Sequence, residues 1–154
     1  MSGNNFFNPT SLARRRRMAE STATFGLLLI CVALIVPFFN PENYAFLTGF
    51  KWVYSAGALI FLVARLINVS DPDESTRLRR LRRLEFWAGI AFVIAAGFWF
   101  YEENRLGALS QYVGVLAVLR NTIMFSLVGA VIQIIASWLI VGQGRKEQKT
   151  TKGK

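Results

Sequence analysis

The chain has 154 residues, of which 53% are hydrophobic and only 18% are charged, and its formal net charge is +9. Soluble domains carry about 25% charged residues, and here the apolar and basic residues occupy separate stretches, which is typical of a polytopic membrane protein. The sequence has no His and one Cys, which excludes histidine-liganded metals, histidine-based catalysis and an internal disulfide.

The first 17 residues are predicted to form a cytoplasmic tail that ends in the basic run Arg14–Arg17. An apolar segment over 19–39 follows it. A basic region before an apolar run is also how a secretory signal begins, but no small-residue cleavage site such as A-x-A comes after this one. We therefore expect an uncleaved first transmembrane helix, in which Cys31 is a small buried hydrophobic residue.

Three further apolar segments are long enough to span a membrane, at about 50–69, 85–101 and 122–142. In an α-helix, about 20 residues cover the hydrocarbon core of about 30 Å. Together with the first segment they form a predicted four-span membrane domain over 18–142, which a basic cytoplasmic tail over 143–154 follows. The predicted fold class is all-α, a bundle of four transmembrane helices.

The loop before the third span is predicted to contain an amphipathic cytoplasmic helix. Asp71 followed by Pro72 is a favourable helix start, and Leu78, Leu81 and Leu84 recur at a spacing of three residues. Five arginines flank this apolar stripe, and we name them the arginine face: Arg77, Arg79, Arg80, Arg82 and Arg83.

The arginine face is predicted to bind anionic lipid headgroups at the cytoplasmic surface, at about 1 kcal/mol for each arginine. An acidic partner protein is another candidate, and a solvated determinant of membrane topology is the simpler alternative. Nucleic acid is not expected as a partner, because no aromatic side chains alternate with these arginines to stack bases.

The segment 106–119 is apolar but short for a membrane span. If this segment is helical, one side of the helix carries its large apolar residues, which are Leu106, Leu109, Tyr112, Val113 and Leu116. This pattern favours an interfacial helix that lies on or dips into the outer leaflet. The alternative is a very long fourth helix that starts outside the membrane.

The basic residues predict the orientation of the chain. With four spans, 14 of the 18 Lys and Arg residues lie on one side, while Lys51, Arg105 and Arg120 lie on the other and Arg65 sits near the inner end of the second span. Inside that span, Arg65 is expected to snorkel outward. The positive-inside rule then places both termini in the cytoplasm of a bacterial inner membrane.

Small and polar residues line one face of the fourth span and form a predicted helix-packing seam. The seam consists of Ser126, Gly129, Ala130, Gln133 and Ser137. Gln133 is the one amide near the middle of a span, so we expect it to hydrogen-bond another helix. The alternative is that it lines a conduction or substrate path.

The carboxylates are all expected in loops or at interfaces, which leaves no group to carry protons through the membrane centre. A Mg²⁺ or Ca²⁺ site at the outer face is one alternative, because oxygen ligands suit these ions. Its candidate ligands are Glu42, Glu102 and Glu103, with Asn43 and Asn104. Because acidic residues are ordinary in outer loops, we predict no metal, no cofactor and no enzymatic activity.

The predicted function is that of a small non-catalytic subunit or scaffold that associates through the seam of the fourth helix. Its predicted partners are membrane lipids and either further copies of the chain or the other subunits of a membrane complex. A small oligomeric channel or carrier is the first alternative, and a membrane-embedded enzyme that uses the outer carboxylates is the second.

Overall fold

The computed structural model describes residues 9–39, 44–67, 76–107, 109 and 115–152. These residues form four long helices, which are α1 (Pro9–Phe39), α2 (Tyr44–Ile67), α3 (Thr76–Leu106) and α4 (Val115–Lys152). Each predicted span corresponds to one of these helices, so the all-α, four-helix prediction is confirmed.

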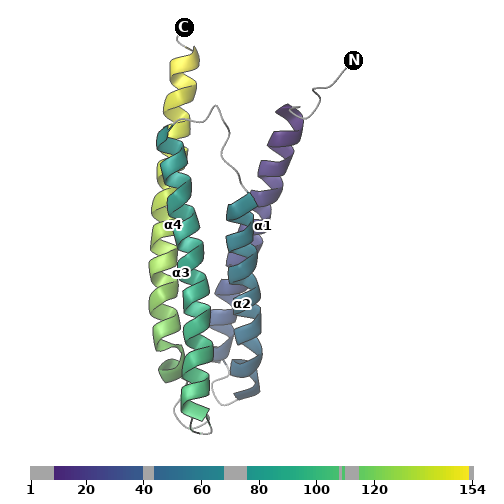
Figure 1. The fold of residues 1–154 in the computed structure, drawn as a ribbon, viewed down its shortest axis with the longest axis vertical. Helices are drawn as coiled ribbons and strands as arrows, with labels where there is room; N and C mark the ends of the chain where they lie inside the picture. Colours follow the sequence, from purple (N-terminus) through teal and green to yellow (C-terminus); the bar gives the residue numbers. More distant parts are fainter. Residues whose placement is uncertain (1–8, 40–43, 68–75, 108, 110–114, 153–154) are drawn as a thin grey trace.

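The helices form two antiparallel hairpins that lie side by side (Figure 1). Helix α1 packs along α2 and α3 packs along α4, while contacts between α2 and α3 join the two hairpins. Helices α1 and α4 scarcely touch. The start of α1 and the end of α4 lie at one end of the bundle, called here the terminal end, and the opposite end is called the turn end.

All four helices are long and apolar enough to cross a membrane, over Ala13–Phe39, Leu47–Ile67, Thr76–Leu106 and Val115–Gln143. Large apolar side chains cover the outside of the bundle, and Leu28, Leu59, Leu127 and Ile134 are all more than half exposed. Such a surface suits lipid hydrocarbon, and these features indicate a multi-pass membrane protein.

Small residues bring α1 and α2 together. The buried positions of α1 alternate at spacings of four and three residues and consist of Ala19, Ala23, Gly26, Ile30, Ala33 and Pro37. A Cβ atom on Gly26 would lie 2.8 Å from the carbonyl oxygen of Gly57, and a Cβ on Gly57 would lie 2.8 Å from the carbonyl oxygen of Gly26. The two backbones therefore touch at this crossing, as small residues permit in membrane helix pairs.

Cys31 lies on the exposed side of α1, so the prediction that it is buried is wrong. Its neighbour Ile30 belongs to the buried stripe. Successive residues on a helix are rotated by about 100°, which turns Cys31 away from α2.

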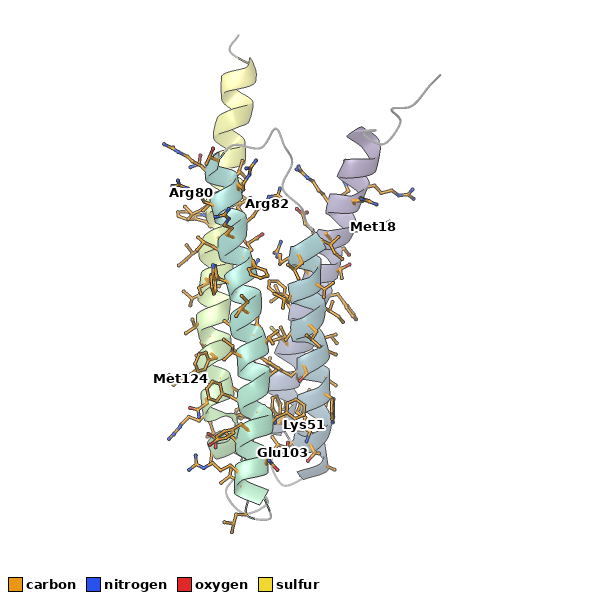
Figure 2. All side chains as sticks on the ribbon, viewed as in Figure 1. Met18, Lys51, Arg80, Arg82, Glu103 and Met124 are labelled. Atoms are coloured by element: carbon orange, nitrogen blue, oxygen red, sulfur yellow. The ribbon has the colours of Figure 1, made fainter. Side chains whose placement is uncertain are left out.

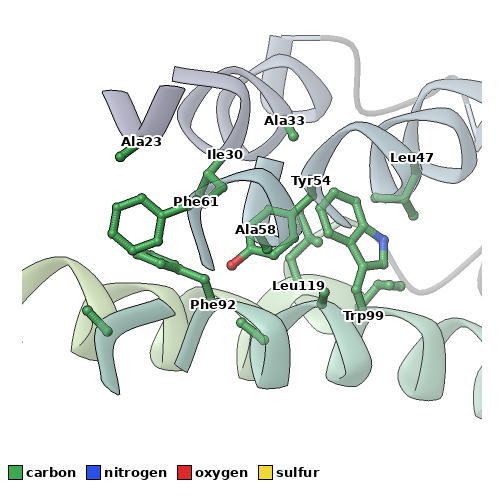
Figure 3. Close-up of a cluster of buried hydrophobic side chains, with 14 of the residues drawn as sticks. Ala23, Ile30, Ala33, Leu47, Tyr54, Ala58, Phe61, Phe92, Trp99 and Leu119 are labelled. Atoms are coloured by element: carbon green, nitrogen blue, oxygen red, sulfur yellow. The ribbon is translucent and has the colours of Figure 1, made fainter. Parts of the chain in front are cut away.

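Aromatic side chains fill the middle of the bundle between α2 and α3 (Figure 3). The rings of Phe61 and Phe92 meet edge to face with centroids 5.5 Å apart, and those of Tyr54 and Trp99 are 5.7 Å apart. All four side chains are almost fully buried. Aromatic pairs at such separations stabilise a core beyond the area they bury, so this layer holds the two hairpins together.

The described residues of the segment 106–119 include the end of α3 and the start of α4. Leu106 is the last residue of α3, Gly107 adopts a left-handed backbone with φ of 48°, and the residues from Val115 onward belong to α4. Val118 and Leu119 are fully buried in the core, and this packing makes them the first turns of the fourth helix. Left-handed glycine is a common helix terminator, so the end of α3 also has a local cause. Residues 108 and 110–114 lie outside the described part of the chain.

Candidate functional site

A cluster of polar side chains joins three helices near the terminal end of the bundle. The guanidinium Nη1 of Arg65 on α2 lies 3.0 Å from the carboxylate Oε2 of Glu85 on α3. The amide Nε2 of Gln133 on α4 donates to Glu85 Oε1 at 3.4 Å and to Ser137 Oγ at 3.1 Å. We call these four residues the terminal cluster. Glu85 is its centre, because both of its oxygens have partners from other helices.

The charges of the terminal cluster are shielded from solvent. The side chains of Arg65 and Glu85 are 12% and 8% exposed, and the guanidinium of Arg65 lies 5.2 Å from the ring centroid of Phe61. A buried charge is tolerated when it is paired and hydrogen-bonded. Two buried atoms of the cluster, Arg65 Nε and Gln133 Oε1, have no hydrogen-bond partner among the described residues.

The terminal cluster changes two expectations drawn from the sequence. Arg65 does not snorkel outward but turns inward to Glu85. Glu85, expected at the interface, is buried between helices. The sequence contained only a weak indication of this pair. Arg65 lies a few residues before the end of the second predicted span, and Glu85 is the first residue of the third. Because consecutive spans are antiparallel, these two positions lie at the same depth in the bundle.

The predicted seam of α4 lies mainly inside the chain. Ser126, Gly129 and Gln133 are buried, while Ala130 and Ser137 are half-buried. A Cβ atom on Gly129 would lie 3.0 Å from Cε1 of Phe92, which shows that α3 fills the seam. The buried part of the seam is therefore packed against α3 within the chain.

The seam also reaches α2 through a hydrogen bond that the sequence did not indicate. The hydroxyls of Tyr54 and Ser126 are 2.6 Å apart, and Ser126 also donates to the carbonyl of Thr122 at 2.6 Å. Thr122 in turn donates to the carbonyl of Ala95 on α3 at 3.1 Å. These bonds continue the polar links between helices through the aromatic layer.

The arginine face lies at the terminal end, where Figure 2 shows Arg80 and Arg82. Arg82 is half-buried, and the other four arginines of the face are exposed. The helix carrying them continues without a break from Thr76 into the apolar part of α3. The predicted helix start at Asp71–Pro72 lies outside the described residues.

A second cluster, called here the turn cluster, occupies the opposite end, where Lys51 and Glu103 lie together (Figure 2). Lys51 Nζ is 3.0 Å from Glu103 Oε2, and the hydroxyl of Thr48 donates to Glu103 Oε1 at 3.2 Å. The neighbouring Glu102 accepts a hydrogen bond of 2.8 Å from Asn121 Nδ2. Glu103 thus binds α2, while Glu102 binds α4.

These contacts bear on the outer carboxylates considered as a metal or catalytic site. Glu102 and Glu103 point to different helices, and Glu42 and Asn43 lie outside the described residues. Within the described ranges, no group of three or more His, Cys, Asp or Glu side chains is placed to hold a metal ion.

A cavity of about 480 Å³ opens beside the turn cluster. Among the described residues, its lining consists of Lys51 from α2, Phe100, Glu103 and Asn104 from the end of α3, and Gly107, which follows α3. The ammonium of Lys51 lies 5.2 Å from the ring centroid of Phe100, and the ring of Trp52 meets that of Phe100 edge to face at 5.1 Å. The volume is within the range of small-molecule sites, and the lining offers both signs of charge beside an aromatic ring.

Comparisons of this chain with protein-family models, with curated proteins and with solved structures found no match.

Proposed function

We propose that this chain is a small non-catalytic subunit or scaffold of an assembly in a bacterial inner membrane. One observation carries the proposal: the buried polar side chains are used to link helices to one another. Glu85 links α3 to α2 and α4, Ser126 meets Tyr54, and Glu103 meets Lys51. Such links specify one arrangement of helices in a membrane, which is what a scaffold requires.

The packing between the two clusters supports the same proposal. The aromatic layer of Tyr54, Phe61, Phe92 and Trp99 separates the terminal cluster from the turn cluster with almost fully buried rings. The polar side chains within this layer, Tyr54, Ser126 and Thr122, are buried and hydrogen-bonded to one another or to backbone carbonyls. These contacts favour a rigid structural role for the layer.

The distribution of basic side chains supports an orientation with the terminal end in the cytoplasm. The arginine face lies at this end (Figure 2), together with Arg14–Arg17 at the start of α1. Lys51 lies at the turn end. By the positive-inside rule we place both termini in the cytoplasm, where the arginine face contacts anionic headgroups.

A partner protein, either a second copy or another membrane subunit, would contact the outside of the bundle, because α3 already fills the seam of α4. The outward faces of α1 and α4 carry many large exposed apolar side chains, among them Phe25, Leu28, Leu127 and Ile134. These faces are where we expect a crosslink to an assembled partner.

A small carrier or channel is the second candidate, and the terminal cluster is the observation that favours it. Polar and ionisable groups within membrane spans mark transport pathways in many proteins. Arg65 Nε and Gln133 Oε1 are buried there, and no described residue hydrogen-bonds to either atom. A substrate that supplied the missing partners would bind between α2 and α4.

Site-specific photocrosslinking in native membranes distinguishes the two candidates. A crosslinker at Leu28 or Leu127 is expected to trap discrete products of fixed mass, while one at the buried Gln133 is expected to trap none. The proposal of a scaffold is wrong if no position yields a product and proteoliposomes containing the chain carry a solute flux that Gln133→Leu abolishes.

A further inference from the structure

An apolar depression lies on the outer side of α3 near the turn end. Its volume is about 250 Å³, and the described residues that line it are Ile94, Gly97, Phe98 and Tyr101. It is open at Gly97, because a Cβ atom there would have no neighbour within 4 Å. On the side of α4 it is bounded by the ring of Phe98, which stacks on that of Phe125 with centroids 4.8 Å apart. We call this depression the Gly97 groove.

Arg105 lies beyond the turn-end side of this groove. It follows Tyr101 by four residues and Phe98 by seven, so the three residues share one side of α3. Side chains on a helix lean toward its N-terminus, which directs Arg105 back toward Tyr101. Glu103, two residues after Tyr101, lies on the opposite side of α3, where it meets Lys51 of α2. Arg105 is therefore in line with the Gly97 groove, whereas the turn cluster is not.

The contacts of Arg105 leave it able to bind a further anion. Its Nη1 lies 3.7 Å from Oε2 of Glu102, and its side chain is 64% exposed. The other oxygen of Glu102 accepts a hydrogen bond of 2.8 Å from Asn121, which holds this carboxylate on the α4 side of the groove. Because 3.7 Å is longer than a hydrogen bond, the guanidinium keeps N–H groups that can donate to an anion. Phosphate oxygens are preferred acceptors for such a group.

The surroundings of Arg105 favour an amphiphilic occupant. The groove extends from Tyr101 to Ile94, and Ile94 lies about 16 Å from Arg105 along the axis of α3. The exposed ring of Tyr101 lies between the guanidinium and the groove, and Tyr is enriched at the depth of lipid headgroups. A cation on the headgroup side and an apolar groove on the hydrocarbon side fit a phosphate ester that carries an acyl chain.

A second copy of the chain fits this surface less well than a lipid does. Copies in one membrane have the same orientation, so a two-fold symmetric pair through the Gly97 groove would place both Arg105 side chains at the same depth. Like charges brought together in this way disfavour association. The same positive charge attracts a phosphate.

We propose that Arg105 and the Gly97 groove bind one phospholipid in the leaflet at the turn end. The phosphate accepts hydrogen bonds from the guanidinium, and one acyl chain passes Tyr101 and lies in the groove against Phe98. The site recognises the phosphodiester and not the group esterified beyond it. It is separate from the arginine face, which lies at the terminal end (Figure 2).

The test is native mass spectrometry of the full chain in detergent, titrated with dioleoyl-phosphatidylcholine or with dioleoylglycerol. The first lipid has a phosphate but no net charge, and the second has the same acyl chains without a phosphate. Arg105→Gln is expected to weaken phosphatidylcholine binding about tenfold, which corresponds to the loss of one hydrogen bond to a charged group. Dioleoylglycerol should bind the parent chain and Arg105→Gln equally.

Arg120→Gln is the matched control for charge. Arg120 is exposed near the turn end of α4, and Phe125 follows it by five residues, which turns Arg120 about 140° away from the ring stack of Phe98 and Phe125. Its loss should leave phosphatidylcholine binding unchanged. Equal weakening by Arg105→Gln and Arg120→Gln would overturn the proposal, because a general loss of positive charge would then explain both results.

Gly97→Leu tests the groove independently of Arg105. The added side chain occupies the space of the acyl chain and is expected to weaken phosphatidylcholine binding about fivefold through the lost apolar contact. Gly142→Leu is its control, because Gly142 is also helical with open space at its Cβ. This control should bind the lipid as the parent chain does.

Three further results would overturn the proposal. The first is equal binding of phosphatidylcholine by the parent chain, Arg105→Gln and Gly97→Leu. The second is displacement of the lipid by soluble glycerophosphocholine at equal concentration, which would identify a small phosphate ester as the ligand. The third is dimer formation that Gly97→Leu abolishes, which would assign the groove to a second copy of this chain.

Discussion

Arg65 and Glu85 are paired at 3.0 Å between consecutive helices, and Glu85 simultaneously accepts a hydrogen bond from Gln133 on the fourth helix. A single carboxylate therefore determines the relative positions of α2, α3 and α4 at the terminal end. At the turn end, two carboxylates of α3 make the corresponding contacts: Glu103 pairs with Lys51 on α2, and Glu102 accepts a hydrogen bond from Asn121 on α4. The bundle is held by polar contacts at both ends and by aromatic packing in between.

Removing one partner of the buried pair should destabilise the fold more than removing both. Glu85→Leu leaves the Arg65 guanidinium buried without its counter-charge and is expected to cost about 3–5 kcal/mol of unfolding free energy. The double variant Arg65→Met with Glu85→Leu should cost clearly less, because no uncompensated charge remains. Unfolding in mixed detergent micelles measures both. Equal losses in the two variants would show that the pairing is unimportant.

The crossing of α1 and α2 should not tolerate even one added methyl group. Gly26→Ala places a Cβ 2.8 Å from a backbone oxygen of α2, which cannot move as a flexible side chain can. We expect a loss of about 1–3 kcal/mol from overpacking. Gly49→Ala, at an open helical position of α2, is the control and should be neutral or slightly stabilising. Thermal unfolding of the two variants makes the comparison.

On α4, bulk at Gly129 should do more damage than loss of the Gln133 amide. Gly129→Leu forces its side chain against Phe92 and the carbonyl of Ala88. Gln133→Leu removes one hydrogen bond to Glu85, and such bonds in membranes average only about 0.6 kcal/mol. Melting temperatures in detergent should therefore fall further for Gly129→Leu. The reverse order would mean that the amide, not the close packing, determines how α4 fits against α3.

The arginine face should contribute to lipid binding without supporting the helix. Replacing its five arginines with Gln is expected to weaken the binding of phosphatidylglycerol to the chain in detergent, at about 1 kcal/mol for each arginine. The binding of phosphatidylcholine, which has no net charge, should not change. Circular dichroism of the purified variant should show unchanged helix content, because Leu78 is buried against the bundle and keeps the start of α3 in place. A fall in helix content would assign the arginines a structural role.

Both termini are expected in the cytoplasm. A reporter that is active only in the periplasm, fused after Lys154, should give no activity, whereas the same reporter inserted after Asn104 should be active. The physical reason is that 14 of the 18 basic residues lie at the predicted cytoplasmic side and resist translocation. Activity of the fusion at Lys154 would reverse the proposed orientation.

The presence of four helices long and apolar enough to cross a membrane could be predicted from the sequence, because hydropathy over about 20 residues is a local property. The segregation of the arginines could be read in the same way. The ends of the helices were harder to predict from the sequence. The third span was predicted at 85–101, whereas the helix that contains it covers Thr76–Leu106. Hydropathy detects the part that crosses the bilayer, whereas the helix continues for as long as its backbone hydrogen bonds and packing allow.

In the described part of the segment 106–119, the most deeply buried residues lie outside the predicted apolar stripe. Its helical periodicity indicated a stripe that includes Leu109 and Leu116, and both side chains are exposed. The residues that pack are Val118 and Leu119, in register with the buried face of α4. A periodic stripe says which residues share a side of a helix, but not which neighbouring helix is available to cover it.

The sequence by itself determined the number of membrane helices, the concentration of basic residues on one side and the presence of a polar amide in the last span. Only the tertiary structure decided which side chains meet: Arg65 with Glu85, Gly26 with Gly57, and Lys51 with Glu103. Within a membrane, lipid tails are as apolar as the helix surfaces, so hydrophobicity does not select one helix pairing over another. That selection comes from close packing at small residues and from hydrogen bonds between helices, and both depend on the three-dimensional arrangement of the chain.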